Sequence, residues 1–148
     1  MQADHYPYRL SLKDINSLST YKRDSIVEAN HNALIIWNPN IEKTVVDKVC
    51  MSIDVIPTVY NLFGIEYDSR LFVGNDIFSN KDGLAMFANR SWVTEYGTYY
   101  ANSSKFVPNS EDVSSEYIEK INNIVNNRMN ISKMIIANNY YKYITINE

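Results

Sequence analysis

The sequence predicts an α/β fold in which a small antiparallel sheet is combined with helices. A compact apolar run comes first, and a short amphipathic helix pattern follows it. Short segments rich in aromatic and β-branched residues come next, and the chain closes with helical periodicity. This order is typical of a mixed layer structure. The chain has 148 residues, so we expect residues 1–148 to form a single domain.

The first third of the chain predicts little regular structure apart from one strand. Residues 11–31 are polar with scattered apolar points, which favours short helices or loops. The run Ala33–Trp37 is apolar throughout and ends at the turn-forming residues 38–40. A short apolar run bounded by turn residues predicts a buried strand.

A helix is predicted over residues 53–63. Ser52 or Asp54 can cap its start, and Pro57 is tolerated in the first turn, where no intrahelical N–H bond is needed. Gly64 is a suitable residue just beyond the last turn, because it accepts the left-handed conformation there.

Residues 65–83 carry two turn signals and are expected to form a loop. Residues 84–107 then change character, because they are rich in aromatic and β-branched residues. Their apolar segments are separated by Asn89-Arg90 and by residues 95–97, a pattern that predicts an antiparallel meander.

The C-terminal part predicts terminal helices. From Ser110 the apolar residues recur with a period of 3.6. Asn130 is expected to cap a second helix. The residues that share the apolar face of the first helix are Val113, Tyr117, Ile121, Ile124 and Val125.

Charge and cysteine content exclude several classes of protein. With 14 basic and 17 acidic residues the formal charge is −3, which excludes a global electrostatic footprint for nucleic acid. A single cysteine excludes an internal disulfide and a cysteine-rich zinc site. Cys50 lies in the apolar run 45–56 and is expected to be buried. No apolar stretch approaches the roughly 20 residues of a membrane span, and the start lacks signal-peptide features.

The adjacent pair Asp4-His5 is the main candidate for chemistry. A carboxylate and an imidazole that follow a strand can both reach one divalent ion, and these donors suit Mn²⁺ or Zn²⁺. Taken alone, the dipeptide is more often a solvated tail. His31 is expected at the surface, and the tyrosines at 96, 99 and 100 are expected on a sheet face instead of a glycan-binding surface.

Two segments carry a resemblance to a known family. The run from Asp54 through Pro57-Thr58 to Gly64-Ile65 resembles a segment of the sulfatase and alkaline-phosphatase-like superfamily. The run Asp4-His5-Tyr6-Pro7-Tyr8 looks like the metal-binding turn of its lipoteichoic acid synthase branch, the phosphoglycerol transferases. The resemblance covers nearly the whole chain but only the C-terminal part of the family's catalytic domain. It therefore implies the C-terminal portion of an alkaline-phosphatase-like fold.

The resemblance implies a transfer reaction on phosphatidylglycerol-type phosphodiesters in the synthesis of a cell-envelope polymer. In the family, a metal-bound threonine hydroxyl attacks the phosphorus, diacylglycerol leaves, and the glycerophosphate passes to the polymer. The metal lowers the pKa of the hydroxyl and neutralises charge on the phosphoryl oxygens. Asp4 and His5 would supply two ligands of a divalent metal, with Mn²⁺ expected.

This chain holds no counterpart of the nucleophile, and Thr58 is not expected to take that role because it lies inside the predicted helix. We therefore expect no catalytic residue here, an inert isolated chain, and a missing N-terminal half as its partner. The parent would be a membrane protein with an extracytoplasmic catalytic domain, and this segment alone would be soluble. The alternatives are a sulfatase or phosphoethanolamine transferase fragment, and a non-catalytic envelope-binding module.

Overall fold

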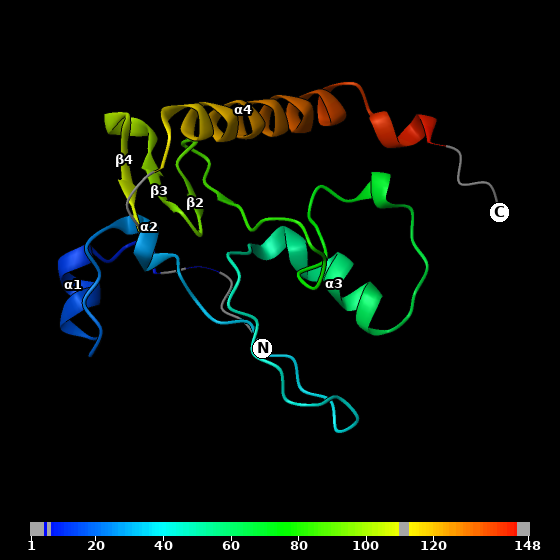
Figure 1. The fold of residues 1–148 in the computed structure, drawn as a ribbon, viewed down its shortest axis with the longest axis horizontal. Helices are drawn as coiled ribbons and strands as arrows, with labels where there is room; N and C mark the ends of the chain where they lie inside the picture. Colours follow the sequence, from blue (N-terminus) through cyan, green and yellow to red (C-terminus); the bar gives the residue numbers. More distant parts are fainter. Residues whose placement is uncertain (1–4, 6, 110–112, 145–148) are drawn as a thin grey trace. The chain divides into compact units, whose positions relative to one another are not determined.

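The computed structural model describes residue 5, residues 7–109 and residues 113–144 (Figure 1). The chain divides into two compact units, Met1–Thr44 and Val45–Glu148. The prediction of one domain over residues 1–148 stays a prediction. None of the helices in these described ranges is both long enough and apolar enough to cross a membrane.

The first unit contains two short helices, in agreement with the polar pattern of residues 11–31. They are α1 (Leu12–Ser17) and α2 (Ile26–Ala29). Ser11 and Asp14 form a capping box at the start of α1. The Asn16 side chain accepts a hydrogen bond from the Arg23 backbone N–H at 2.9 Å and donates one to its carbonyl at 2.8 Å. These two bonds fix the connection between the helices.

The predicted strand Ala33–Trp37 is wrong, because the run lies outside the sheet. Ile35, Ile36 and Trp37 are exposed, and Trp37 is 81 % exposed. An apolar run becomes a sheet strand only when other strands pair with it, and that pairing depends on tertiary contacts, not on the run itself.

The predicted helix at 53–63 is confirmed in the second unit. A 3₁₀ turn, η1 (Ser52–Asp54), leads into α3 (Val55–Leu62). Gly64 has φ +63°, and its N–H donates to the Asn61 carbonyl at 3.0 Å. The N–H of Ile65 donates to the Tyr60 carbonyl at 2.9 Å. This pair of bonds is a Schellman motif, which ends α3 where the glycine indicated.

The predicted antiparallel meander is also confirmed. It has four strands, one more than the three apolar segments that Asn89-Arg90 and residues 95–97 separate. Its strands are β1 (Ala85–Met86), β2 (Trp92–Thr94), β3 (Gly97–Tyr100) and β4 (Lys105–Pro108). They pair in the order β1-β2-β3-β4, and every pair is antiparallel. Short connections suffice because each strand pairs with its neighbour in sequence. The predicted loop 65–83 contains one 3₁₀ turn, η2 (Ser69–Leu71).

A single helix, α4 (Ser115–Ala137), follows the sheet. Ser114 caps it by accepting the Tyr117 N–H at 3.1 Å. The expected second helix starting at Asn130 is wrong, because α4 continues through that residue. Asparagine inside a helix costs less than about 1 kcal/mol relative to alanine, and no glycine or proline interrupts the pattern nearby. The chain then forms η4 (Tyr140–Tyr143).

The core of the second unit lies between the sheet and the first half of α4. Trp92, Ile121 and Val125 are buried at its centre, and Trp92 has no accessible surface. The Trp92 ring stacks on Tyr99, with centroids 5.5 Å apart. Its indole N–H donates to the Asn122 side-chain oxygen at 2.8 Å. The helical periodicity of residues 113–125 therefore predicted the buried face correctly. Figure 1 shows α4 extending beyond the sheet.

Candidate functional site

The predicted metal pair is only partly described by the structure. Asp4 lies outside the described residues. His5 is exposed, and its ring stacks on Tyr8 with centroids 4.4 Å apart and planes 11° apart. Within the described ranges, no group of three or more His, Cys, Asp or Glu side chains is placed to hold a metal ion. The pair Asp4-His5 therefore stays a prediction, and it could supply only part of a coordination shell.

Asp54 and Thr58, the polar residues of the superfamily-like segment, both have structural roles. The Asp54 carboxylate is 9 % exposed; it accepts the Met51 N–H at 2.9 Å and the Asn75 N–H at 2.8 Å. The fully buried Thr58 hydroxyl donates to the Asp54 carbonyl at 2.6 Å and accepts the Ile77 N–H at 3.1 Å. These contacts fix the loop around residues 75–77 to the start of α3. Thr58 is therefore a buried residue that links α3 to this loop.

Two glycines allow the loop to pack this closely. A Cβ at Gly74 would lie 2.0 Å from the Ile53 carbonyl oxygen, and a Cβ at Gly83 would lie 2.2 Å from the Val49 oxygen. Neither neighbour can move easily, because both are backbone atoms. Any side chain at these positions would push the loop away from the segment that leads into α3.

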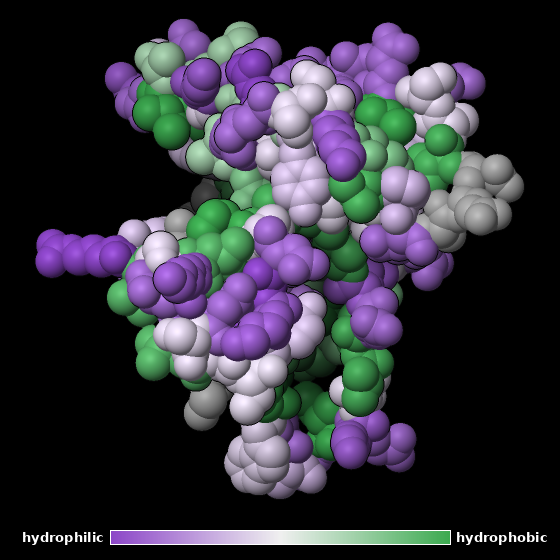
Figure 2. All heavy atoms as spheres, turned by 90° about the vertical axis from the view of Figure 1, so that its left-hand side faces the viewer, coloured by the Kyte–Doolittle hydropathy of each residue, from purple (hydrophilic) through white to green (hydrophobic). Residues whose placement is uncertain are grey.

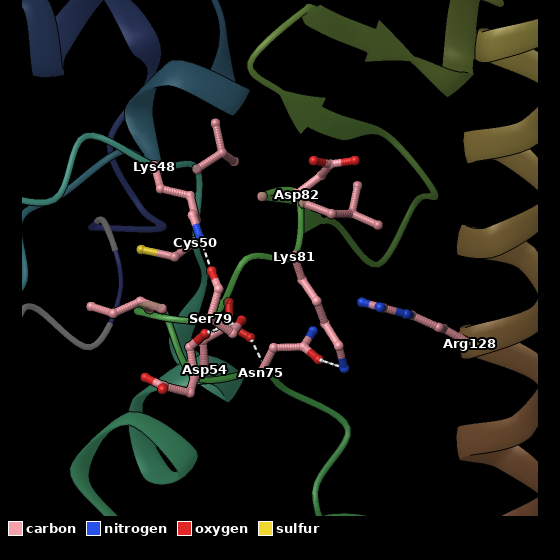
Figure 3. Close-up of a pocket in the computed structure, with 13 residues that line it drawn as sticks. Lys48, Cys50, Asp54, Asn75, Ser79, Lys81, Asp82 and Arg128 are labelled. Atoms are coloured by element: carbon pink, nitrogen blue, oxygen red, sulfur yellow. Dashed lines mark hydrogen bonds between the residues drawn. The ribbon is translucent and has the colours of Figure 1, made fainter. Parts of the chain in front are cut away.

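A small pocket lies between this loop, the segment before α3 and α4 (Figure 3). Its volume of about 20 Å³ is close to that of one water molecule. Lys48, Lys81 and Arg128 line it together with Asp54, Asp76 and Asp82, so its formal charges balance. Lys81 donates to the Asn75 side chain at 2.8 Å, and Lys48 donates to the Ser79 carbonyl. The pocket is too small and too neutral to be a substrate site.

Cys50 lines the same pocket and is exposed, so the expectation of a buried cysteine is wrong. The apolar residues around it did not bury it, because the core of this unit forms between the sheet and α4. Partial desolvation raises the pKa of the Cys50 thiol; the Asp54 carboxylate raises it further, and Lys48 opposes both. A raised thiol pKa disfavours the nucleophilic thiolate.

The alkylation of Cys50 should therefore be slow for an exposed cysteine. We expect iodoacetamide to modify the folded chain more slowly than the urea-unfolded chain at pH 8, because the folded state holds less thiolate. The folded chain should also need a higher pH to reach half its maximal rate. In Lys48→Gln, which removes the charge that lowers this pKa, the reaction should slow further. Mass spectrometry of the modified cysteine measures both rates, and a faster reaction in the folded chain would contradict the prediction.

The remaining candidates behave as surface or packing residues. His31 is exposed beyond the end of α2, as expected. Tyr99 packs against Trp92 on the core face of the sheet, which confirms the sheet-face interpretation at that position. Tyr96 is exposed and meets Tyr117 edge to face at 5.1 Å.

The two ends of the sheet differ in charge, a feature that the sequence analysis did not single out. At one end, the β1–β2 turn holds Arg90 and the β3–β4 connection leads into Lys105. Between residues 84 and 109 the only carboxylate is Glu95, in the β2–β3 turn at the opposite end. The signal that could have revealed this was the gap in acidic residues on both sides of Glu95.

The two basic turns are tied together and carry unusual backbone geometry. The Ala101 N–H donates to the buried Ser91 hydroxyl at 3.1 Å, which joins one turn to the other. Arg90 has φ +69° and Ser104 has φ +50°. Both angles lie in the left-handed region that glycine adopts most readily.

Comparison of the chain with family models, with curated proteins and with solved structures found no match.

Proposed function

We propose that this chain is the C-terminal segment of a sulfatase-family phosphoglycerol transferase with an alkaline-phosphatase-like catalytic domain. It would act on phosphatidylglycerol-type phosphodiesters in cell-envelope polymer synthesis. One observation carries the proposal: Asp4-His5-Tyr6-Pro7-Tyr8 precedes the Asp54-to-Ile65 segment in the order that the family's C-terminal part shows.

The local geometry of the second segment supports this proposal. Asp54 anchors the start of α3, and Pro57 lies in the first turn, where it disturbs no intrahelical bond. The Schellman motif at Gly64 and Ile65 then ends the helix. Asp54, Pro57 and Gly64 thus each have a physical task in this segment.

Exposed apolar side chains support the view that this is part of a larger catalytic domain. Figure 2 shows hydrophobic residues reaching the surface among hydrophilic ones. A segment of a larger domain presents apolar side chains that the rest of the domain would cover. Large hydrophobic residues exposed in the described ranges include Ile35, Trp37, Val45, Phe63, Ile131, Met134 and Ile136.

The donor types at the N-terminal pair fit a divalent metal. Carboxylate oxygen and imidazole nitrogen suit Mn²⁺, and His5 is exposed, so its ring is accessible to an ion held jointly with another lobe. A catalytic site usually needs about three protein ligands, so a missing N-terminal half must supply the others. When bound, the metal would acidify the nucleophile's hydroxyl and neutralise phosphoryl charge.

The partners follow from the proposal. They are the N-terminal half of the catalytic domain, a phosphatidylglycerol-like lipid and the acceptor end of a polymer. The parent protein would be held at the cell membrane with its catalytic domain outside the cytoplasm. The isolated segment would be inactive, because it holds none of the family's nucleophile machinery.

Substitution of His5 tests the proposed function in the complete protein that contains this chain. The His5→Ala variant should lose turnover of fluorescent phosphatidylglycerol to diacylglycerol by about 100-fold or more, because a metal ligand is removed. Added Mn²⁺ should restore little of this loss. His31→Ala is the matched control, since it removes the chain's other exposed histidine, and its turnover should stay unchanged.

Two results would overturn this assignment. One is a His5→Ala variant that turns over as fast as the His31→Ala control. The other is Mn²⁺-dependent phosphodiesterase activity in the 148-residue chain alone, since the proposal leaves that chain without a nucleophile.

A further inference from the structure

The basic end of the sheet has the composition of an anion-binding surface. Arg90 and Lys105 bring two positive charges to it, although the whole chain carries a formal charge of −3. The segments 84–94 and 97–109 contain no carboxylate that could neutralise these two cations locally. In the part of the chain that the structure describes, neither Arg90 nor Lys105 makes an ion pair.

The neighbouring side chains add hydrogen-bonding groups. Asn102, Ser103 and Ser104 are exposed in the β3–β4 connection, next to Lys105. Amide and hydroxyl donors of this kind, together with a guanidinium group, match the oxygen atoms of a phosphate. The Ala101 N–H that donates to the Ser91 hydroxyl joins the two turns at the same end of the sheet.

The opposite end of the sheet has the reverse character. An open depression of about 250 Å³ there is lined by Asp47, Asp82 and Glu95, together with Lys48 and Lys81. Asp82 and Glu95 also raise the pKa of Tyr96, with Glu95 contributing most. Three carboxylates stand against two lysines at this end, whereas the strand and turn segments at the basic end contain two cations and no carboxylate. The basic end is therefore the more favourable of the two for an anion.

Two residues at the basic end, Arg90 and Ser104, adopt the left-handed backbone conformation. Glycine at residue 90 or 104 would relieve a left-handed conformation that arginine and serine adopt less readily. A fold that holds polar side chains at such positions gives up some stability, and sites that bind ligands are where such strain concentrates.

We propose that the two turns at this end of the sheet, with Arg90 and Lys105 as the cations, bind phosphate ester anions. The choice of a phosphate ester among anions rests on the proposed function. The existence of the positive surface is independent of that proposal. The phosphate could belong to a soluble glycerophosphate chain or to a lipid headgroup, and the chemistry of recognition is shared.

Binding is tested on the ¹⁵N-labelled 148-residue chain with sn-glycerol 3-phosphate at low salt. Amide signals of residues 89–91 and 101–105 should shift, and the shifts should shrink as salt is added. Arg90→Gly and Lys105→Gln should each weaken binding about two- to fivefold, as exposed ion pairs do. The double variant should abolish the shifts. Lys133→Gln, on the exposed side of α4, is the matched control and should bind normally.

Co-sedimentation distinguishes the two sources of phosphate. Binding to vesicles of phosphatidylglycerol in phosphatidylcholine, lost in the double variant, assigns the headgroup; binding to glycerol 3-phosphate alone assigns the soluble ester. The inference is overturned if the chain binds neither the vesicles nor glycerol 3-phosphate, or if the amide shifts persist in the double variant. Arg90→Gly should stay folded because glycine adopts φ +69° without the steric cost that arginine has there, so lost binding would not reflect unfolding. None of these assays measures turnover, so their failure is separable from a failure of the proposed function.

Discussion

The Trp92→Ala variant is expected to lose about 3–5 kcal/mol of the free energy of unfolding, the range for removing a large buried aromatic side chain. Trp92, in β2, is fully buried between the sheet and α4, and it contacts the rings of Tyr99 and Phe106. Its removal would leave a cavity between the sheet and the helix, and it would leave the Asn122 side-chain oxygen without its donor. Urea denaturation followed by far-UV circular dichroism measures the loss.

Trp37→Ala is the matched control, because residues 37 and 92 are the chain's two tryptophans and only Trp37 is exposed. Its unfolding free energy should change by no more than about 0.5 kcal/mol. In this control, the remaining fluorescence should come from Trp92 and should shift to longer wavelength only on unfolding. Equal destabilisation by the two substitutions would contradict the assignment of the core.

The Asp54→Ala variant is expected to lose about 2–4 kcal/mol, since two charge-assisted hydrogen bonds disappear together. The Met51 and Asn75 N–H groups would lose their acceptor, and the loop around residue 75 would come away from α3. Asp54→Asn keeps one carbonyl acceptor, so its loss should be smaller. Thermal unfolding of the unsubstituted chain, Asp54→Asn and Asp54→Ala, followed by circular dichroism, measures this order of stability.

Asp82→Asn is the control for Asp54, because Asp82 is an exposed acidic residue that lines the same pocket. Its stability should match that of the unsubstituted chain. If Asp54→Ala were no less stable than Asp82→Asn, the carboxylate would not be the anchor of the loop, and the structural interpretation of the superfamily-like segment would fail.

Local signals were reliable where the sequence itself supplies the partner. The helix 53–63 was predictable because its proline and terminal glycine act over a few residues. The expected cap is wrong, because Asp54 makes no side-chain cap bond to α3 and Ser52 lies inside η1. The meander at 84–107 was predictable for a similar reason, since neighbouring strands pair across short connections. The face of α4 that carries Ile121 and Val125 followed from periodicity alone.

Signals that need a distant partner were less reliable. The composition of Ala33–Trp37 resembles that of a strand, but composition cannot supply the strand that would pair with it. Cys50 lies among apolar residues, yet the core forms elsewhere and leaves the thiol exposed. Asn130 carries a capping side chain, but the helix around it was already propagating, and a cap is needed only where a helix starts.

The candidate site shows the same division. The residue types at Asp4-His5 and around Asp54 could be selected from the sequence, because donor chemistry belongs to the side chain. Only the tertiary structure shows that the Asp54 carboxylate accepts the Asn75 N–H. It also shows that a hydrogen bond from Ala101 to Ser91 links the turn that holds Arg90 to the connection that leads into Lys105.

The sequence by itself determined the C-terminal end of α3, the strand order of the meander and the apolar stripe of α4, since these depend on backbone preferences and spacing along a few turns. Only the tertiary structure decided that Trp37 and Cys50 are exposed, that the Thr58 hydroxyl is inaccessible, and that the sheet has one basic end. The reason is physical: burial and electrostatic fields sum over neighbours far apart in the chain, and folding alone sets which neighbours these are.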